Sequence, residues 1–250
     1  MQLESASLTD NGGRPRNEDA FGEWASERLY YCAIADGAGG HGGGDVAARI
    51  VVDTSLADLR FLTVDELPPD GERLKRALLH AHENIMEEQG RGGEVADMRS
   101  TGLLLAIDRD RRTAAWAHCG DTRLYYFRGG VLDARTKDHS VVQEMMDAHL
   151  VSAEDARHHP RRNILLSALG TREGAEIAST GGTREVLAHD VLLLCTDGLW
   201  GYVDDASMID SLAHASSSAD WLNRMATQVR DTAPPGNDNF TALAIWVGGL

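Results

Sequence analysis

The chain has 250 residues, of which 42% are apolar and 25% are charged, and its formal net charge is −15. This composition is that of a folded globular protein, and no apolar run reaches the roughly 20 residues that a membrane helix needs. The acidic excess argues against binding to nucleic acid or anionic lipid, because both need Lys and Arg to neutralise phosphates.

In chain order, the first segment, "MQLESASLTDNGG", has neither a basic start nor an apolar stretch. We therefore expect no signal peptide and a cytoplasmic location. Runs rich in branched and aromatic residues predict strands at 29–35, 101–108, 113–120, 123–132, 190–197 and 240–248. Helical spacing of apolar residues and capping signals predict helices at 44–60, 72–89, 140–149, 152–158 and 218–230.

Several predicted strands follow one another without a helix between them, which favours antiparallel sheets. The strands around 108–112 and those around 119–122 are predicted to form hairpins. With no repeat and no long linker, residues 1–250 are expected to form a single α+β domain. Its three cysteines are odd in number and lack C-x-x-C spacing, so we expect buried free thiols at Cys32, Cys119 and Cys195.

Aspartates recur at the ends of the predicted strands. Four lie directly beside apolar runs and a fifth stands next to Glu18 in "RPRNEDAF": Asp36, Asp121, Asp197, Asp238 and Asp19. Charges at the ends of buried strands are costly unless they are compensated, and few cations lie nearby in the sequence.

A divalent cation such as Mg²⁺ or Mn²⁺, which prefers oxygen ligands, would compensate several carboxylates at once. In the alternative interpretation each aspartate is a turn residue, and the spacing alone does not decide whether they converge.

The stretch "ADGAGGHGGGDVA" (35–47) is unusually rich in glycine. It lacks the lysine of a nucleotide-binding P-loop. Glycines would allow the backbone to approach an ion closely, with Asp36 and the Gly37 carbonyl as its ligands. A surface loop before the helix at 44 explains the same residues, and both interpretations remain open at this point.

Eight motifs occur in the order found in PP2C-type (PPM) protein phosphatases: "RPRNED", "AIADGAGGHGGGDVA", "STGLLLAI", "HCGDTRLYYFRGG", "KDHSVVQEM", "HPRRNILLSALG", "LLLCTDGLW" and "DNFTALAIWV". The chain most resembles the bacterial branch of this family, from about residue 8 to residue 247. The resemblance implies a β-sandwich of two antiparallel sheets flanked by helices, with two metal ions at one end.

The resemblance also implies a role for each matched residue. Asp36 would bridge two Mn²⁺ or Mg²⁺ ions, the Gly37 carbonyl would bind one of them, and Asp197 and Asp238 would bind the other. Glu18 and Asp19 match an acidic pair that reaches the metals, largely through water. Asp121 and Asp197 match a weaker third metal site, and Arg14 matches the arginine that binds the substrate phosphate.

The implied reaction is hydrolysis of phosphoserine and phosphothreonine by a hydroxide that bridges the two metals. His41 would protonate the leaving oxygen, although a structural role in its glycine loop explains it equally well. By the same resemblance the protein would oppose a bacterial Hanks-type Ser/Thr kinase, with an FHA-domain protein as a further partner and a monomer as the default state. The competing hypotheses are a non-catalytic phosphoprotein-binding module and a hydrolase of small phosphomonoesters.

Overall fold

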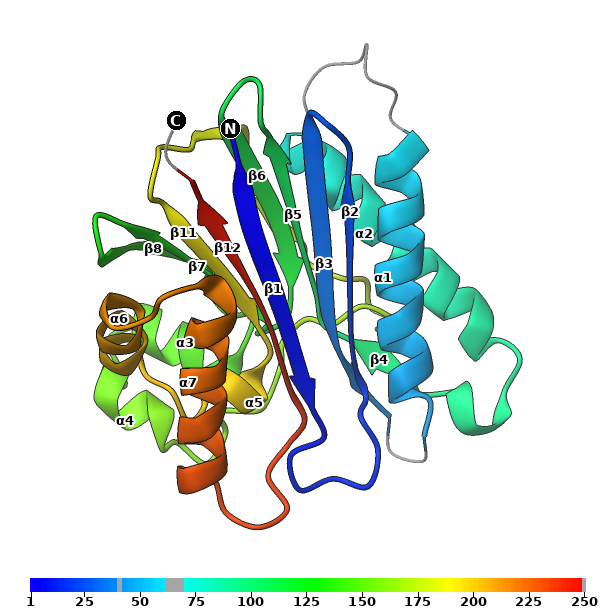
Figure 1. Cartoon of the computed structure of the whole chain (residues 1–250). Coiled ribbons are helices and arrows are strands. Elements are labelled where there is room, and N and C mark those ends of the chain that lie inside the picture. Colours follow the sequence, from blue (N-terminus) through cyan, green and yellow to red (C-terminus); the bar gives the residue numbers. More distant parts are fainter. Residues whose placement is uncertain (40–41, 62–69, 249–250) are drawn as a thin grey trace.

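The structure is a computed structural model that describes residues 1–39, 42–61 and 70–248. Two antiparallel sheets pack face to face, and helices cover their outer faces (Figure 1). The α+β sandwich expected from the sequence is therefore confirmed.

Every strand pairing in the part of the chain that the structure describes is antiparallel. The five-stranded sheet has the order β1 (Leu3–Asp10), β12 (Phe240–Val247), β11 (Val191–Cys195), β7 (Arg123–Arg128) and β8 (Val131–Arg135). The seven-stranded sheet has the main order β10 (Arg184–Glu185), β6 (Thr113–Cys119), β5 (Gly102–Asp108), β3 (Leu29–Ala38) and β2 (Asp19–Ala25). Its two short additions are β4 (Arg99–Ser100), paired with β3, and β9 (Ala178–Ser179), paired with β6.

The helices divide between the two sheets (Figure 1). The seven-stranded sheet is covered by α1 (Gly44–Phe61) and α2 (Gly71–Gln89). The five-stranded sheet is covered by α5 (Asp197–Trp200), α6 (Asp205–Ala213) and α7 (Ser218–Thr232). The short helices α3 (Val141–Asp147) and α4 (Ala153–Arg157) follow β8, and a single 3₁₀ turn spans Gly93–Val95. Among the described helices, none combines the length and apolar character needed to cross a bilayer.

Successive side chains of a strand lie on opposite faces of its sheet, and this alternation creates separate apolar layers. On β3, Tyr31 and Ala33 pack against the helices, whereas Cys32 and Ile34 pack between the two sheets. Successive side chains of a strand point to opposite faces, so this buried strand serves two cores at once.

The layer between the sheets changes from apolar to polar at one end of the sandwich. The residues that continue its inward-facing rows beyond Ile34, Leu103, Leu194 and Leu243 are Asp36, Thr101, Thr196 and Thr241. Thr196 donates a hydrogen bond to Asp19, and the Thr101 hydroxyl lies 2.6 Å from that of Thr122. Alternation thus places a layer of carboxylate and hydroxyl groups at the mouth of the inter-sheet core.

Two local predictions from the sequence are wrong. The strands around 119–122 do not form a hairpin, because β6 belongs to one sheet and β7 to the other. Gly120, with φ +92° and a virtual Cβ 2.6 Å from Thr101, allows the chain to leave the first sheet. The run 123–132 is two strands, joined by Gly129 and Gly130 with φ +59° and +78°, which is typical of a tight hairpin turn.

The other predictions about packing agree better with the structure. All three cysteines are buried and free, as expected. The five predicted helices appear within a few residues of their expected ends as α1, α2, α3, α4 and α7. The sequence did not predict strands β1 and β2, helices α5 and α6 or the two-residue strands β4, β9 and β10.

A substitution at Leu192 tests how much the layer between the sheets stabilises the fold, because this side chain is fully buried there. Leu192→Ala should lower the free energy of unfolding by about 2–5 kcal/mol through lost burial and a residual cavity. Leu150→Ala is the control, because Leu150 is 72% exposed, and it should change stability by less than about 0.5 kcal/mol. Guanidinium denaturation measures both, and equal effects would contradict this account of the core.

Candidate metal centre

Two aspartates from neighbouring strands lie side by side at the polar end of the sandwich. Asp19 on β2 pairs directly with Asp36 on β3. Side chains of directly paired residues lie on the same face of an antiparallel sheet, so the two carboxylates are neighbours. The Asp36 backbone is held by Thr101, the residue before β5, because its N–H donates to the Thr101 hydroxyl at 2.9 Å and its carbonyl accepts from the Thr101 N–H at 2.9 Å.

Gly37 lies where several backbone segments meet. Its N–H donates to the Glu18 carbonyl at 3.1 Å. A Cβ at this position would lie 2.0 Å from the Gly44 carbonyl oxygen, so only glycine fits. The close approach brings the start of α1, the end of β3 and the segment carrying Glu18 together at one point.

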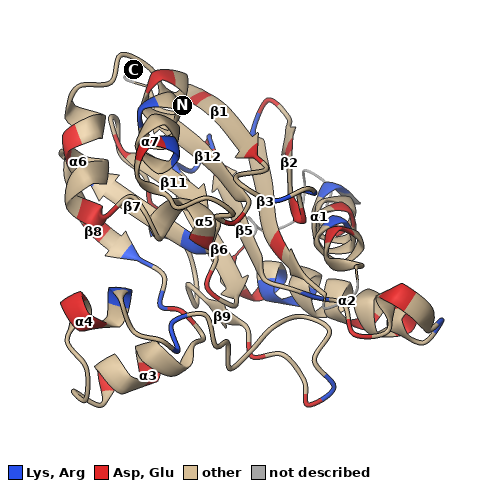
Figure 2. Cartoon of the chain, turned by 90° about the horizontal axis from the view of Figure 1, so that it is seen from below, with Lys and Arg blue, Asp and Glu red and all other residues tan. Residues whose placement is uncertain are grey.

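The five-stranded sheet contributes two further carboxylates. Asp197 follows β11 and begins α5, and its Oδ1 is buried without a hydrogen-bond partner. Asp238 lies two residues before β12, and its carboxylate lies 3.1 Å from Arg14 Nη2. Figure 2 looks onto the end of the sandwich where these segments meet those of the other sheet.

A cavity of about 200 Å³ opens beside these groups. Asp197, Asp238 and Arg14 line it together with Arg162 and Trp200. Arg14 and Asp238 are each about half exposed, at 52% and 48% of their side-chain area. The cavity therefore joins acidic groups to a guanidinium that solvent and an anion can reach.

The electrostatics show that the carboxylates from both sheets converge. Burial, and then the charges of Asp19, Asp197 and Asp121, raise the pKa of Asp36 well above its usual range. Burial is also the main cause that raises the pKa of Asp19 to about 7, and nearby Asp197 and Asp238 add to it. Burial and Asp238 raise the pKa of Asp197 to about 6.

Such an arrangement of like charges fits a divalent cation. The donors are oxygens only, and a bound cation would pair with the orphaned Asp197 Oδ1 and offset the repulsion. Within the described ranges, no three His, Cys, Asp or Glu side chains form a metal cluster by themselves. The carboxylates would therefore share an ion with other oxygens, such as the Gly37 carbonyl and water.

The structure brings the predicted acidic residues to one end of the fold. Asp19, Asp36, Asp121 and Asp197 interact electrostatically, and Glu18 lies against Gly37 through its backbone. His41 lies outside the described residues, so its predicted role stays a prediction.

Sequence reasoning missed the residues that support this site. Asn239 is buried and accepts a hydrogen bond from the Glu18 N–H at 2.9 Å. Its side-chain amide donates to the carbonyls of Asn11 and Arg16, both at 2.9 Å. Asn239 thereby fastens the loop that carries Arg14 and Glu18 to β12. The only signal in the sequence is its place beside Asp238.

Comparisons with known proteins agree with this geometry. The family model described as protein phosphatase 2C matches residues 12–243. The serine/threonine phosphatase stp of Listeria welshimeri is 32% identical, over 95% of this chain and 93% of that protein. The crystal structure of the Mycobacterium tuberculosis serine/threonine phosphatase PstP/Ppp is 30% identical, covers 99% of each chain and has a TM-score of 0.83. A structure of the PstP catalytic domain with two manganese ions is also 30% identical, covers 99% of each chain and has a TM-score of 0.78.

The raised pKa values predict how stability depends on pH without metal. Near neutral pH the folded state binds more protons at Asp19 and Asp36 than the unfolded state does, so stability is lost as pH rises. Between about pH 8 and 6.5 in EDTA, where Asp19 takes up its extra proton, each proton bound should raise Tm by about 3–5 °C per unit decrease in pH. Below this window His118 opposes the trend, because burial lowers its pKa to about 4.

Saturating Mn²⁺ should remove most of this slope, because a bound cation keeps the carboxylates ionised. Thermal unfolding in EDTA and in Mn²⁺ across the window measures the effect. A Tm in EDTA that stays level or falls as pH decreases would contradict the buried acidic cluster.

The crowding at Gly37 predicts a second outcome. Gly37→Ala should destabilise the protein by about 1–3 kcal/mol, because the backbone must move to admit the methyl group. The same movement should weaken Mn²⁺ binding, measured by calorimetry. Gly182→Ala is the matched control, because a Cβ there meets nothing within 4 Å. Unchanged stability and Mn²⁺ binding in Gly37→Ala would show that the close approach is not required.

Proposed function

The chain belongs to the protein phosphatase 2C family and is a metal-dependent protein phosphatase, and we propose that it hydrolyses phosphoserine and phosphothreonine at the acidic end of its sandwich. The observation that carries this assignment is the convergence of buried, mutually repelling carboxylates from both sheets beside an accessible arginine. We also infer that residues 1–250 act as a single catalytic domain.

Each acidic residue has a proposed place at the metal centre. The oxygen donors are those of Glu18, Asp19, Asp36, Gly37, Asp121, Asp197 and Asp238. Bound Mn²⁺ or Mg²⁺ would supply a water of lowered pKa as the nucleophile and would neutralise charge on the phosphate. Two ions are proposed, with a third, weaker one near Asp121 and Asp197.

Neighbouring residues of the chain hold the carboxylates of this centre in position. The register of β2 and β3 holds Asp19 beside Asp36, and Thr196 donates to the Asp19 carboxylate at 2.9 Å. Because Thr196 and Thr241 are fully buried, water has little access behind the carboxylates. The carboxylates of Asp19 and Asp36 are thus held on the side of the inter-sheet core and face solvent only through the cavity.

Arg14 is the proposed phosphate-binding residue. Its guanidinium reaches the cavity, where Asp238 is its partner at 3.1 Å. A planar guanidinium can bind two phosphate oxygens at once, and charge-assisted contacts of this kind strengthen as negative charge develops. A phosphate in the cavity would compete with Asp238 for Arg14, which leaves Asp238 free to serve the metal centre.

The phosphoprotein substrates follow from the relatives. The proteins to which this chain is similar are called serine/threonine phosphatases, which supports phosphorylated Ser/Thr proteins as substrates here. We propose that these are the targets of a bacterial Ser/Thr kinase, with an FHA-domain protein among them. The cytoplasmic location, the monomeric state and the role of His41 stay predictions.

The first experiment measures phosphate release from a phosphothreonine peptide and from a small phosphomonoester. Turnover should require Mn²⁺ or Mg²⁺, stop in EDTA, and fall by about 10²–10³-fold in Asp197→Asn, which keeps the shape but not the charge. Faster turnover of the peptide would favour a protein substrate. Tight peptide binding without turnover under any metal would instead identify a phosphoprotein reader.

Arg14 has its own test. Arg14→Ala should lower kcat/KM for the phosphopeptide by about 10–100-fold, which corresponds to the loss of charged hydrogen bonds to phosphate. Arg172→Ala removes an exposed arginine outside the cavity and is the control. Equal activities of the two variants would exclude Arg14 as the phosphate-binding residue.

A further inference from the structure

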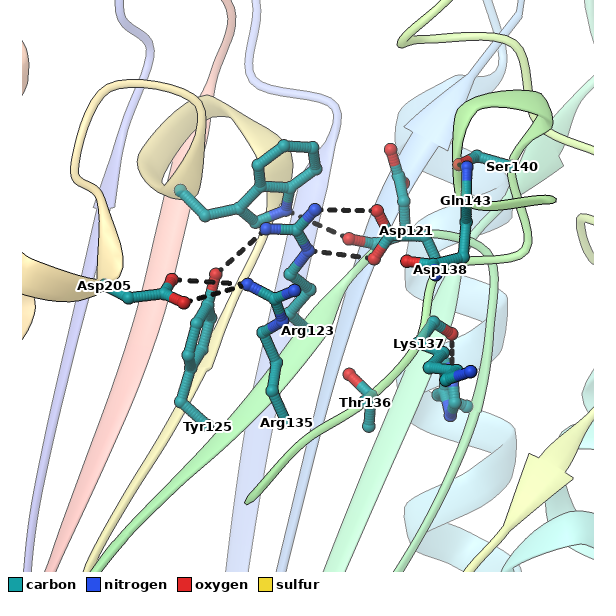
Figure 3. Close-up of polar contacts among 12 residues, drawn as sticks. Asp121, Arg123, Tyr125, Arg135, Thr136, Lys137, Asp138, Ser140, Gln143 and Asp205 are labelled. Atoms are coloured by element: carbon teal, nitrogen blue, oxygen red, sulfur yellow. Dashed lines mark hydrogen bonds and ion pairs between the residues drawn. The ribbon is translucent and has the colours of Figure 1, made fainter. Parts of the chain in front are cut away.

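A buried arginine lies just behind the acidic cluster. Arg123 begins β7, two residues after Asp121, and only 13% of its side chain is exposed. Its Nε and Nη2 donate to the two carboxylate oxygens of Asp138 at 2.8 and 2.7 Å, and its Nη1 donates to the Tyr125 hydroxyl at 3.1 Å (Figure 3). All three guanidinium nitrogens therefore have partners, which leaves the group little freedom to rotate.

The indole ring of Trp200 stacks on the flat face of this guanidinium. The Arg123 Cζ lies 3.5 Å from the centre of the Trp200 ring, which is close stacking of a cation on an aromatic face. Trp200 is the last residue of α5, the short helix that begins with Asp197. Its Nε1–H donates to the backbone carbonyl of Asp121 at 3.0 Å.

One indole therefore joins two chain segments that each carry an acidic residue. It is three residues from Asp197 along α5, and its hydrogen bond ends on Asp121 itself. Asp121 is almost fully buried, at 5% exposure, so its carboxylate has little room to adjust independently of its backbone. The distance between the two carboxylates thus depends on where the indole is held.

We propose that Trp200 and Arg123 are positioning residues that set the spacing of Asp121 and Asp197, and so the affinity of the third, weaker divalent cation. This inference rests on the proposed function, which assigns these two carboxylates to that ion. Neither Trp200 nor Arg123 touches the cation or the phosphate in this role. They act through the backbone of Asp121 and through α5.

The chemistry of each residue suits the task. Phenylalanine could stack on Arg123 but has no N–H for the Asp121 carbonyl. Lysine could meet Asp138 but has neither the planar face nor the paired donors of a guanidinium. Trp200→Phe removes the hydrogen bond to the Asp121 carbonyl, and Arg123→Lys removes the paired contact with Asp138. Both substitutions keep most of the side-chain volume.

The substitution at Trp200 should retain an aromatic ring, because Trp200 also lines both the cavity of about 200 Å³ and a neighbouring cavity of about 350 Å³. A substitution to alanine would join or reshape these cavities and would confuse positioning with the loss of a wall.

The chain contains a matched control for each variant. The Trp246 Nε1 is buried without a hydrogen-bond partner, so Trp246→Phe removes an N–H that holds nothing. Arg128, at the other end of β7, contacts Asp190 through Nε at 3.0 Å and Nη2 at 2.8 Å, and it also reaches a tyrosine hydroxyl. Arg128→Lys therefore breaks the same kind of contact far from the acidic cluster.

Calorimetric titration of the metal-free protein with Mn²⁺ is the primary measurement, alongside thermal unfolding in EDTA. We expect the wild type to bind two ions tightly and one more weakly. In Trp200→Phe and Arg123→Lys the weak step should lose about 3- to 10-fold in affinity, the size of effect that one lost hydrogen bond gives. The tight steps should stay within about 2-fold of wild type, as should all steps in both controls.

Two results would overturn the proposal. In one, the weak step is absent from the wild type or is the same in all variants. In the other, every Mn²⁺ step weakens together in proportion to the Tm lost in EDTA, as a merely structural role requires. If Arg123→Lys fails to fold, Trp200→Phe decides alone. Metal-dependent turnover of the phosphopeptide by the wild type is scored separately, so the proposed function can stand when this inference fails.

Discussion

The burial of several like-charged carboxylates at one end of the sandwich is the constraint to which the surrounding structure is adapted. Burial and mutual repulsion raise the pKa values of Asp19, Asp36 and Asp197 together. Such a cluster persists only where its members are held against their repulsion or share a cation. The threonine layer behind them, the glycine contact at Gly37 and the Asn239 brace all hold backbone or carboxylate oxygens in place.

The position of the cluster follows from how the two sheets pack. Asp19 and Asp36 come from the seven-stranded sheet, whereas Asp197 and Asp238 adjoin strands of the five-stranded sheet. The apolar layer between the sheets, which begins directly behind the cluster at Ile34 and Leu194, therefore sets how far apart the carboxylates of the two sheets lie. A site of this kind is rigid because the core is rigid, and substrate choice is left to the loops around its mouth.

The sequence predicted the strands beside Asp36, Asp197 and Asp238, because runs such as 29–35 and 240–248 are strongly apolar, but it missed β2, which carries Asp19. It also picked out the acidic residues, although their convergence depends on strand order, which local patterns do not encode. The false hairpin at 119–122 shows the limit. A short polar link suits a hairpin or a crossing between sheets equally well, and only the packing of β6 and β7 on different partners decides. Residues such as Asn239, Arg123 and Trp200 were missed as supports, because their partners are distant in the sequence or lie in the backbone.

The pairing of β1 with β12 has a consequence for how the protein is made. Leu3 lies opposite Val247, so the first and last strands of the structure are neighbours in one sheet. During synthesis β1 emerges long before its partner, and the five-stranded sheet stays incomplete until residues 240–247 have left the ribosome. Asp238, which introduces that last strand, arrives at the same moment. A chain that stops before residue 238 therefore lacks part of the acidic cluster, and the cluster is complete only once residues 238–247 have joined the sheet.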